Sequence, residues 1–139
     1  MVKRERDGTA PARRRIFVVE DHPVMRETYL MLFAHAADLD VCGTATDGEN
    51  ALRQIRELAP ELALVDVSLP GISGLDLVAA LRTEHPELRL VVVTGHDDPL
   101  YADAAFDAGA DGFVRKGDTA GILRVLRQAL ALPIRSNGS

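Results

Sequence analysis

The chain has 139 residues, of which 47% are hydrophobic and 27% charged, a balance typical of one soluble globular domain. Its single cysteine, Cys42, excludes an internal disulfide framework. The sequence contains neither an apolar run of the ~18 residues that a membrane span needs nor the apolar stretch of a signal peptide. We therefore expect a cytoplasmic protein that does not insert into a membrane.

The net charge of −5 is unevenly distributed. Residues 1–15 carry six basic and two acidic side chains, a net charge of +4, which leaves −9 for the remainder. An acidic body argues against a broad nucleic-acid-binding surface. We expect residues 1–14 to form a disordered basic tail, residues 15–132 to fold as the domain, and residues 133–139 to form a second disordered tail. The basic tail could instead contact an acidic partner.

Short apolar runs alternate with helical patterns from residue 15 onward. The runs are IFVV (16–19), VCGTA (41–45), LALV (62–65), LVVV (90–93) and GFV (112–114). They are rich in Val, Ile and Leu and do not alternate with polar residues, which is typical of strands covered on both faces. The helical patterns lie at about 25–36, 51–59, 77–81, 99–108 and 122–130.

Residues that commonly begin or end helices flank these patterns: Ser73 with Asp76, Asp47, Asp118, Asp98 with Pro99, and Gly109. Strands that alternate with helices predict an α/β fold, a doubly wound parallel sheet with helices on both faces. The apolar face of the 99–108 pattern is mostly alanine, so we expect this helix to be the most loosely packed.

Polar side chains follow four of the five apolar runs. Glu20 and Asp21 follow the first run, Asp66 the third, Thr94 the fourth and Lys116 the fifth. In such a sheet a ligand binds outside the carboxyl ends of the strands, where the strand order reverses. The sequence therefore predicts a site made of acids, a hydroxyl and an amine.

The chemistry of this set favours a divalent cation and a phosphoryl group. Two like charges ~4 Å apart repel by about 4 kcal/mol at an effective dielectric constant of 20, so crowded carboxylates need a cation or a proton. Oxygen ligands without a His or Cys cluster favour Mg²⁺, or Mn²⁺, over zinc. A lysine and a threonine can bind phosphoryl oxygens, and a carboxylate can be the nucleophile. The set indicates phosphoryl transfer onto a carboxylate.

Four segments resemble the receiver domain of bacterial two-component response regulators: VVEDHP, LALVDVSLPGISGLDL, VVVTGHDD and GADGFVRKGD. The resemblance covers residues 15 to about 130, and the spacings between Asp21, Asp66, Thr94 and Lys116 lie in the family's usual range. The HP after the acids and the KGD after the last strand are similar to the LuxR-type subclass. The resemblance implies a flavodoxin-like five-stranded sheet of order 2-1-3-4-5 with five helices.

The resemblance also implies a role for each site residue. Asp66 would accept a phosphoryl group from a sensor histidine kinase or a phosphotransfer protein. Glu20 and Asp21 would hold Mg²⁺ together with Asp66 and the backbone carbonyl of Ser68. Lys116 would neutralise the phosphoryl group. Glu20 stands where aspartate is commoner, and as an alternative it is a solvated acid that only tunes Asp21.

A switch is implied as well. Thr94 would turn its hydroxyl toward the phosphoryl group, and Phe113 stands where the family's rotating aromatic stands. The face made by the fourth helix, the fifth strand and the fifth helix would then repack, and a homodimer could form. The domain would be no enzyme beyond its own phosphorylation and dephosphorylation, and would serve signal transduction and transcription regulation. LuxR-type proteins normally continue into a DNA-binding domain, but we expect no direct DNA binding by these residues.

Two other functions compete with this interpretation. A pseudo-receiver would use the fold as a protein-docking module without phosphate. A phosphoaspartate hydrolase of the dehalogenase type needs a second aspartate two residues after the nucleophile, and Ser68 stands there instead. Gly117 follows Lys116, where many receivers have a cis proline, so we expect a trans peptide bond here.

Overall fold

The structure is a computed structural model that describes residues 13–95 and 99–132. Its strands are β2 (Arg14–Val19), β3 (Leu39–Ala45), β4 (Leu62–Asp66), β5 (Arg89–Thr94) and β6 (Gly112–Arg115). Its helices are α1 (Pro23–Ala34), α2 (Gly48–Leu58), α3 (Gly74–Glu84), α4 (Pro99–Ala108) and α5 (Thr119–Leu130). Every predicted strand and helix is therefore found. The predicted tails lie almost wholly outside the described residues, and so does Asp98, the expected cap of α4.

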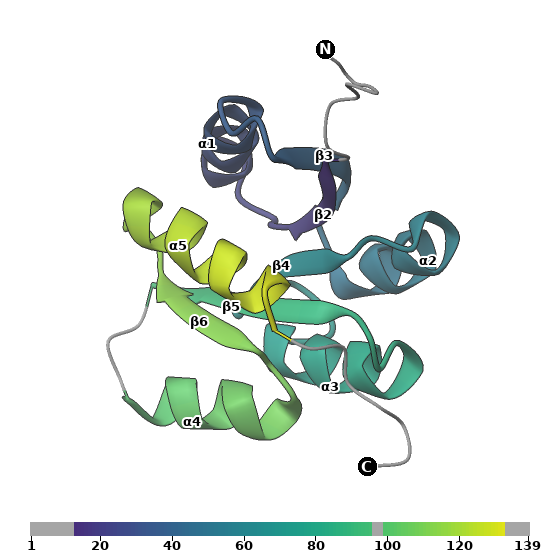
Figure 1. Ribbon diagram of the computed structural model, residues 1–139. Coiled ribbons are helices and arrows are strands. Elements are labelled where there is room, and N and C mark those ends of the chain that lie inside the picture. Colours follow the sequence, from purple (N-terminus) through teal and green to yellow (C-terminus); the bar gives the residue numbers. More distant parts are fainter. Residues whose placement is uncertain (1–12, 96–98, 133–139) are drawn as a thin grey trace.

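The strands form one five-stranded sheet in the order β3-β2-β4-β5-β6 (Figure 1). All neighbouring strands pair in parallel. In chain order this is 2-1-3-4-5, so the predicted flavodoxin-like topology is confirmed. The order reverses beside β2, because the chain first moves outward to β3 and then returns to place β4 on the other side. A ligand site is expected at the carboxyl ends of β2 and β4.

Helices lie on both faces of the sheet (Figure 1), and an apolar layer joins each set of helices to the sheet. One layer joins α1 and α5 to the sheet through Ile16, Val18, Leu62, Leu64, Tyr29, Phe33, Ile122 and Leu126. The other joins α2, α3 and α4 to the opposite face through Phe17, Val19, Ala63, Val65, Ile55, Leu77, Leu81 and Ala105. Successive residues of β2 and β4 thus alternate between the two layers, as the pleat of a strand requires.

Side chains cap the helices at the expected positions. Asp47 Oδ1 accepts the Asn50 N–H at 2.8 Å, and Asp118 Oδ1 accepts the Gly121 N–H at 2.9 Å. Ser73 caps α3 in the same way through the N–H of Asp76. The cap of α1 was not predicted: it is His22, whose Nδ1 accepts the Met25 N–H at 3.5 Å.

The helix α4 is attached more lightly than the others. Among its described residues from Leu100 onward, Ala105 is the one that is buried, and Leu100 and Phe106 are 70% and 50% exposed. This burial agrees with the predicted alanine-rich face. Gly109, at φ +115°, follows the last turn, where a positive φ favours glycine. Within the described part of the chain, no helix is both long and apolar enough to cross a membrane.

Candidate functional site

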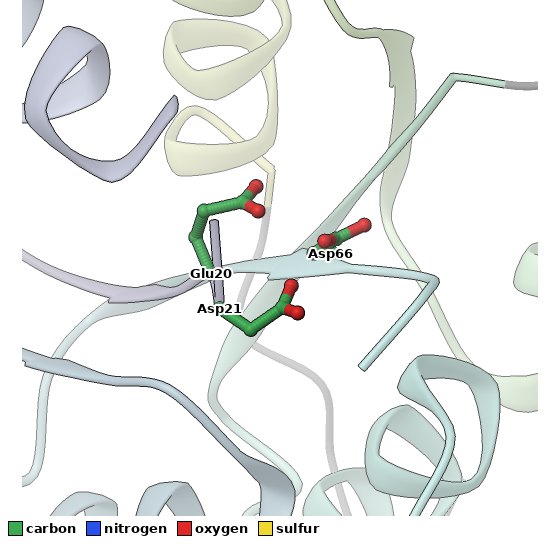
Figure 2. Close-up of side chains that lie close together, drawn as sticks. All are labelled: Glu20, Asp21 and Asp66. Atoms are coloured by element: carbon green, nitrogen blue, oxygen red, sulfur yellow. The ribbon is translucent and has the colours of Figure 1, made fainter. Parts of the chain in front are cut away.

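Three carboxyl groups converge at the carboxyl ends of β2 and β4 (Figure 2). One oxygen from each of Glu20, Asp21 and Asp66 lies within 4.8 Å of the others. Glu20 and Asp21 directly follow β2, and Asp66 is the last residue of β4. The site therefore sits where the strand order reverses, and these three predicted site residues are brought together.

The strand pleat decides the side from which two of these acids reach the site. Ile16 and Val18 belong to the apolar layer of α1 and α5, so alternation carries Glu20 to that same face. Leu62 and Leu64 place Asp66 there by the same rule. Both carboxyl groups are almost fully enclosed, with exposed fractions of 1% for the Glu20 side chain and 2% for that of Asp66. The alternative that Glu20 is a solvated acid is therefore wrong.

Lys116 supplies the positive charge of the site. Its Nζ lies 3.1 Å from Asp66 Oδ2 and 3.4 Å from Glu20 Oε2. Lys116 follows β6, which is separated from β4 by β5, so its side chain reaches across the end of β5. One ammonium group faces two buried carboxylates and a third acid nearby, which leaves an excess of negative charge.

Backbone groups fix the two buried acids. Glu20 Oε2 accepts the His22 N–H at 3.2 Å, and Asp66 Oδ1 accepts the Ser68 N–H at 3.1 Å. The Arg26 guanidinium donates to the backbone oxygen of Glu20 at 3.1 Å and so ties the acidic loop to α1. The predicted metal contact of Ser68, through its carbonyl oxygen, stays a prediction.

The crowding of charge changes the protonation of Glu20. Burial, then a hydrogen bond shared with the Asp66 carboxyl, then the charge of Asp66 raise the pKa of Glu20 from 4.5 to about 7. Burial by itself would lower the pKa of Lys116, but the hydrogen bond and charge of Asp66, followed by the charge of Glu20, outweigh it and raise that pKa. The lysine therefore stays charged, but its single positive charge does not neutralise the three acids.

These residues fit a hard divalent cation. The second oxygen of Glu20, Oε1, is buried and has no hydrogen-bond partner. A buried carboxylate oxygen without a partner is costly, and a cation would satisfy it. Carboxylate oxygens alone favour Mg²⁺ or Mn²⁺. Glu20, Asp21 and Asp66 could hold the ion.

Thr94 and Phe113 belong to the opposite face of the sheet. Leu90 and Val92 lie in the layer of α2, α3 and α4, so alternation along β5 carries Thr94 to that layer. Thr94 is fully buried, and its backbone oxygen accepts the Lys116 N–H at 2.8 Å. Phe113 pairs with Val92 in the sheet and packs against the same layer, half-buried. The two predicted switch residues thus share the face that carries α4.

The peptide bond after Lys116 is trans, as predicted, and no cis bond occurs anywhere in the described ranges. Gly117 has φ +90°, a conformation that favours glycine. The sequence interpretation missed the supporting roles of His22 and Arg26. His22 Nδ1 accepts the backbone N–H of Met25, and the Arg26 guanidinium donates to the backbone oxygen of Glu20. No sequence pattern predicts such contacts.

Known proteins resemble this chain in sequence and in structure. The model of the response regulator receiver domain family matches residues 16–127. The response regulator GacA of Pseudomonas viridiflava is 37% identical over 103 residues, which are 74% of this chain and 48% of that protein. The nitrate/nitrite response regulator NarL of Escherichia coli is 34% identical over 84% of this chain and 54% of its own length. The chain thus spans about half the length of these curated relatives.

Solved structures of response regulators also resemble this chain. A two-component response regulator of the LuxR family from Aurantimonas superposes with a TM-score of 0.82 and 33% identity, over 86% of each chain. The receiver domain of the putative response regulator NarL from Mycobacterium tuberculosis gives a TM-score of 0.81 at 31% identity, covering 88% of this chain and all of that one. Sequence, topology and site position point to the same family.

Proposed function

The chain belongs to the response regulator receiver domain family of two-component systems, and we propose that it acts as a phosphorylation switch with Asp66 as the phosphoacceptor. One observation carries the proposal. Asp66 ends the central strand β4 with Lys116 Nζ 3.1 Å from its Oδ2, and oxygens of Glu20 and Asp21 lie within 4.8 Å. A nucleophile, a cation and a ligand set for a second cation are thus in one place.

The transfer itself needs few groups. An Asp66 carboxylate oxygen attacks phosphorus, the bond from phosphorus to the donor nitrogen of a phosphohistidine breaks, and that nitrogen takes up a proton. Lys116 offsets the charge of the phosphoryl oxygens, and the Ser68 N–H holds the Asp66 carboxylate in place. A Mg²⁺ ion held by Glu20, Asp21, Asp66 and the Ser68 carbonyl would supply the remaining neutralising charge.

The switch follows from the charge that is added. An aspartyl phosphate brings roughly two negative charges to the site, and the Thr94 hydroxyl turns toward them. Phe113 turns into the space that Thr94 leaves, and α4 shifts because its buried contact with the sheet is small. Phosphorylation in this scheme displaces an equilibrium that already exists between two arrangements.

The partners follow from this chemistry. A sensor histidine kinase or a phosphotransfer protein in the cytoplasm donates the phosphoryl group, and a homodimer forms on the face of α4, β6 and α5 after phosphorylation. These residues do not bind DNA directly, and the output is transcription regulation. A pseudo-receiver gains no support, because Glu20, Asp21, Asp66 and Lys116 lie together as the phosphoryl chemistry requires.

Labelling with a small phosphodonor tests the proposal. Acetyl phosphate with Mg²⁺ should add one phosphoryl group to the wild type, measured by intact-mass spectrometry, and EDTA should prevent it. Asp66→Asn should abolish the added mass, because the nucleophilic carboxylate is lost. Asp103→Asn removes an exposed acid of α4 and is the matched control, which should label like the wild type. Label that persists in Asp66→Asn would refute the assignment.

A further inference from the structure

Tyr29 carries a buried hydroxyl that the proposed function does not use. It lies on α1 with 1% of its surface exposed, and its ring stacks on that of Phe33 with ring centroids 6.4 Å apart. Its hydroxyl oxygen is buried and has no hydrogen-bond partner within the described parts of the chain. A buried phenol normally finds one, because leaving the group unpaired costs free energy.

The position of Tyr29 relates it to the acidic site. Tyr29 packs in the apolar layer of α1 and α5, on the sheet face toward which alternation carries Glu20 and Asp66. Burial, followed by the charges of Glu20 and then Asp66, raises the pKa of Tyr29. The hydroxyl therefore lies within the electrostatic reach of both carboxylates, on the same face of the sheet.

A second unpaired atom complements the first. Glu20 Oε2 accepts the His22 N–H and faces Lys116, whereas Glu20 Oε1 is buried without a partner. A phenol hydroxyl can donate, and an ionised carboxylate can only accept. The unpaired donor and the unpaired acceptor thus lie on the same face of the sheet, where both are shut off from solvent.

We propose that Tyr29 is a positioning residue of this site: its hydroxyl and Glu20 Oε1 do not bond to each other directly, and one buried water that accepts from the hydroxyl and donates to Glu20 Oε1 joins them. The longer side chain of glutamate has one more rotatable bond than aspartate, so it needs a second anchor to keep its carboxylate in one orientation. Tyr29 provides that anchor from α1. The consequence for cation binding rests on the proposed function, but the water-mediated contact itself does not.

The sign of a stability change tests the water-mediated contact without any cation. Tyr29→Phe removes only the hydroxyl. In buffer with EDTA at pH 8, where Glu20 is ionised, the variant should unfold about 3 °C lower than the wild type, because the water that donates to Glu20 Oε1 loses its second partner. If the hydroxyl is an unpaired group without a role, its removal should instead raise the unfolding temperature.

A double-mutant cycle assigns the effect to Glu20. In a Glu20→Ala background the acceptor is gone, so Tyr29→Phe should no longer lower the unfolding temperature. Tyr101→Phe removes the other phenol hydroxyl of the chain, on α4 and the opposite face, and serves as the control. Its effect should be the same with and without Glu20. Additive effects of Tyr29→Phe and Glu20→Ala would overturn the proposal.

Cation affinity supplies the functional measurement. Titration of Mg²⁺ by calorimetry should show roughly tenfold weaker binding by Tyr29→Phe, as expected when a group that orients a metal ligand is removed. Tyr101→Phe should bind like the wild type. At saturating Mg²⁺ the labelling rate of Tyr29→Phe should recover, because the hydroxyl does not touch the reacting atoms.

A failure of the inferred role of Tyr29 and a failure of the proposed phosphorylation switch would give different results. A wild type that binds Mg²⁺ and labels on Asp66, beside a Tyr29→Phe variant with unchanged affinity and no coupling to Glu20, leaves the phosphorylation switch intact and refutes the role of Tyr29. A wild type that neither binds Mg²⁺ nor labels refutes the switch. The stability cycle then still decides whether the water-mediated contact exists.

Discussion

The helices α4 and α5 flank β6 in the chain and lie on opposite faces of the sheet, to which they are attached in different ways (Figure 1). The helix α5 buries Ile122 and Leu126 completely in the layer that also encloses the acidic site. The helix α4 buries Ala105 and leaves Leu100 and Phe106 exposed. The proposed reacting groups are thus enclosed on the firmly packed face, and the proposed moving element lies on the lightly packed one.

This division has a physical reason. Charged groups in a low-dielectric site act strongly only if their positions are fixed, so the face that holds Glu20, Asp66 and Lys116 benefits from close packing. A helix that shifts between two arrangements must give up little apolar burial when it moves, and alanine gives up little. The sheet therefore separates the proposed site from the helix that we propose to move.

The largest expected effect tests the packing difference with one chemical change on each helix. Leu126→Ala on α5 should lower the free energy of unfolding by about 3 kcal/mol, because it leaves a cavity in the core. Leu100→Ala on α4 should change it by less than about 0.5 kcal/mol, because that side chain is 70% exposed. Urea unfolding measures both. Equal losses would remove the basis of the comparison.

The second prediction concerns the unfavourable burial of the acids on the α1 and α5 face, and how the free energy of unfolding depends on pH. Glu20 has a pKa of 4.5 in the unfolded chain and about 7 in the fold. The folded protein therefore binds more protons than the unfolded chain between these values, and the free energy of unfolding should fall as the pH rises through that interval. The fall is at most about 3 kcal/mol in buffer without divalent cations.

Urea unfolding from pH 5 to pH 8 measures this slope. Glu20→Gln should flatten it, because the titrating group is gone. Addition of Mg²⁺ should flatten it too if the ion neutralises the acids. A slope that survives in Glu20→Gln would place the titration elsewhere in the molecule.

The third prediction concerns how α4 is held at its end. The Arg82 guanidinium of α3 donates to the Gly109 oxygen just after α4 at 3.1 and 2.9 Å. It also pairs with Asp111, whose side chain is 7% exposed, at 2.8 Å. Arg82→Ala should cost about 2 kcal/mol, because Asp111 loses its buried cation.

The matched control is an exposed pair. Arg56 and Glu84 have side chains 57% and 39% exposed, so Arg56→Ala should cost less than about 1 kcal/mol. If Arg82→Ala has the same small effect, the end of α4 is not fixed by this polar contact, and apolar packing must account for its position.

The sequence predicted the sheet well because its apolar runs and cap residues are local signals. IFVV and LVVV form strands buried on both faces, and Asp47, Ser73 and Asp118 cap helices as expected. The convergence of Asp21, Asp66 and Lys116 followed from one topological rule, namely that parallel strands end at the same edge.

Other features could not be read from residue order. The full burial of Glu20 is a tertiary effect, because it depends on how the elements around the end of β2 pack together. Tyr29 lies within the helical pattern of residues 25–36, and nothing in that pattern indicates that its hydroxyl is buried without a partner. The cap formed by His22 was missed because histidine is an uncommon cap residue.

The short path from Lys116 to α5 has a consequence for signal transmission. Only Gly117 separates the ammonium-bearing residue from Asp118, whose carboxylate caps α5. Because this connection is only one residue long, a displacement of the Lys116 backbone must either rotate the backbone dihedral angles of Gly117 or move the first turn of α5. A phosphoryl group on Asp66 that displaces Lys116 would then also affect α5, on the face opposite α4.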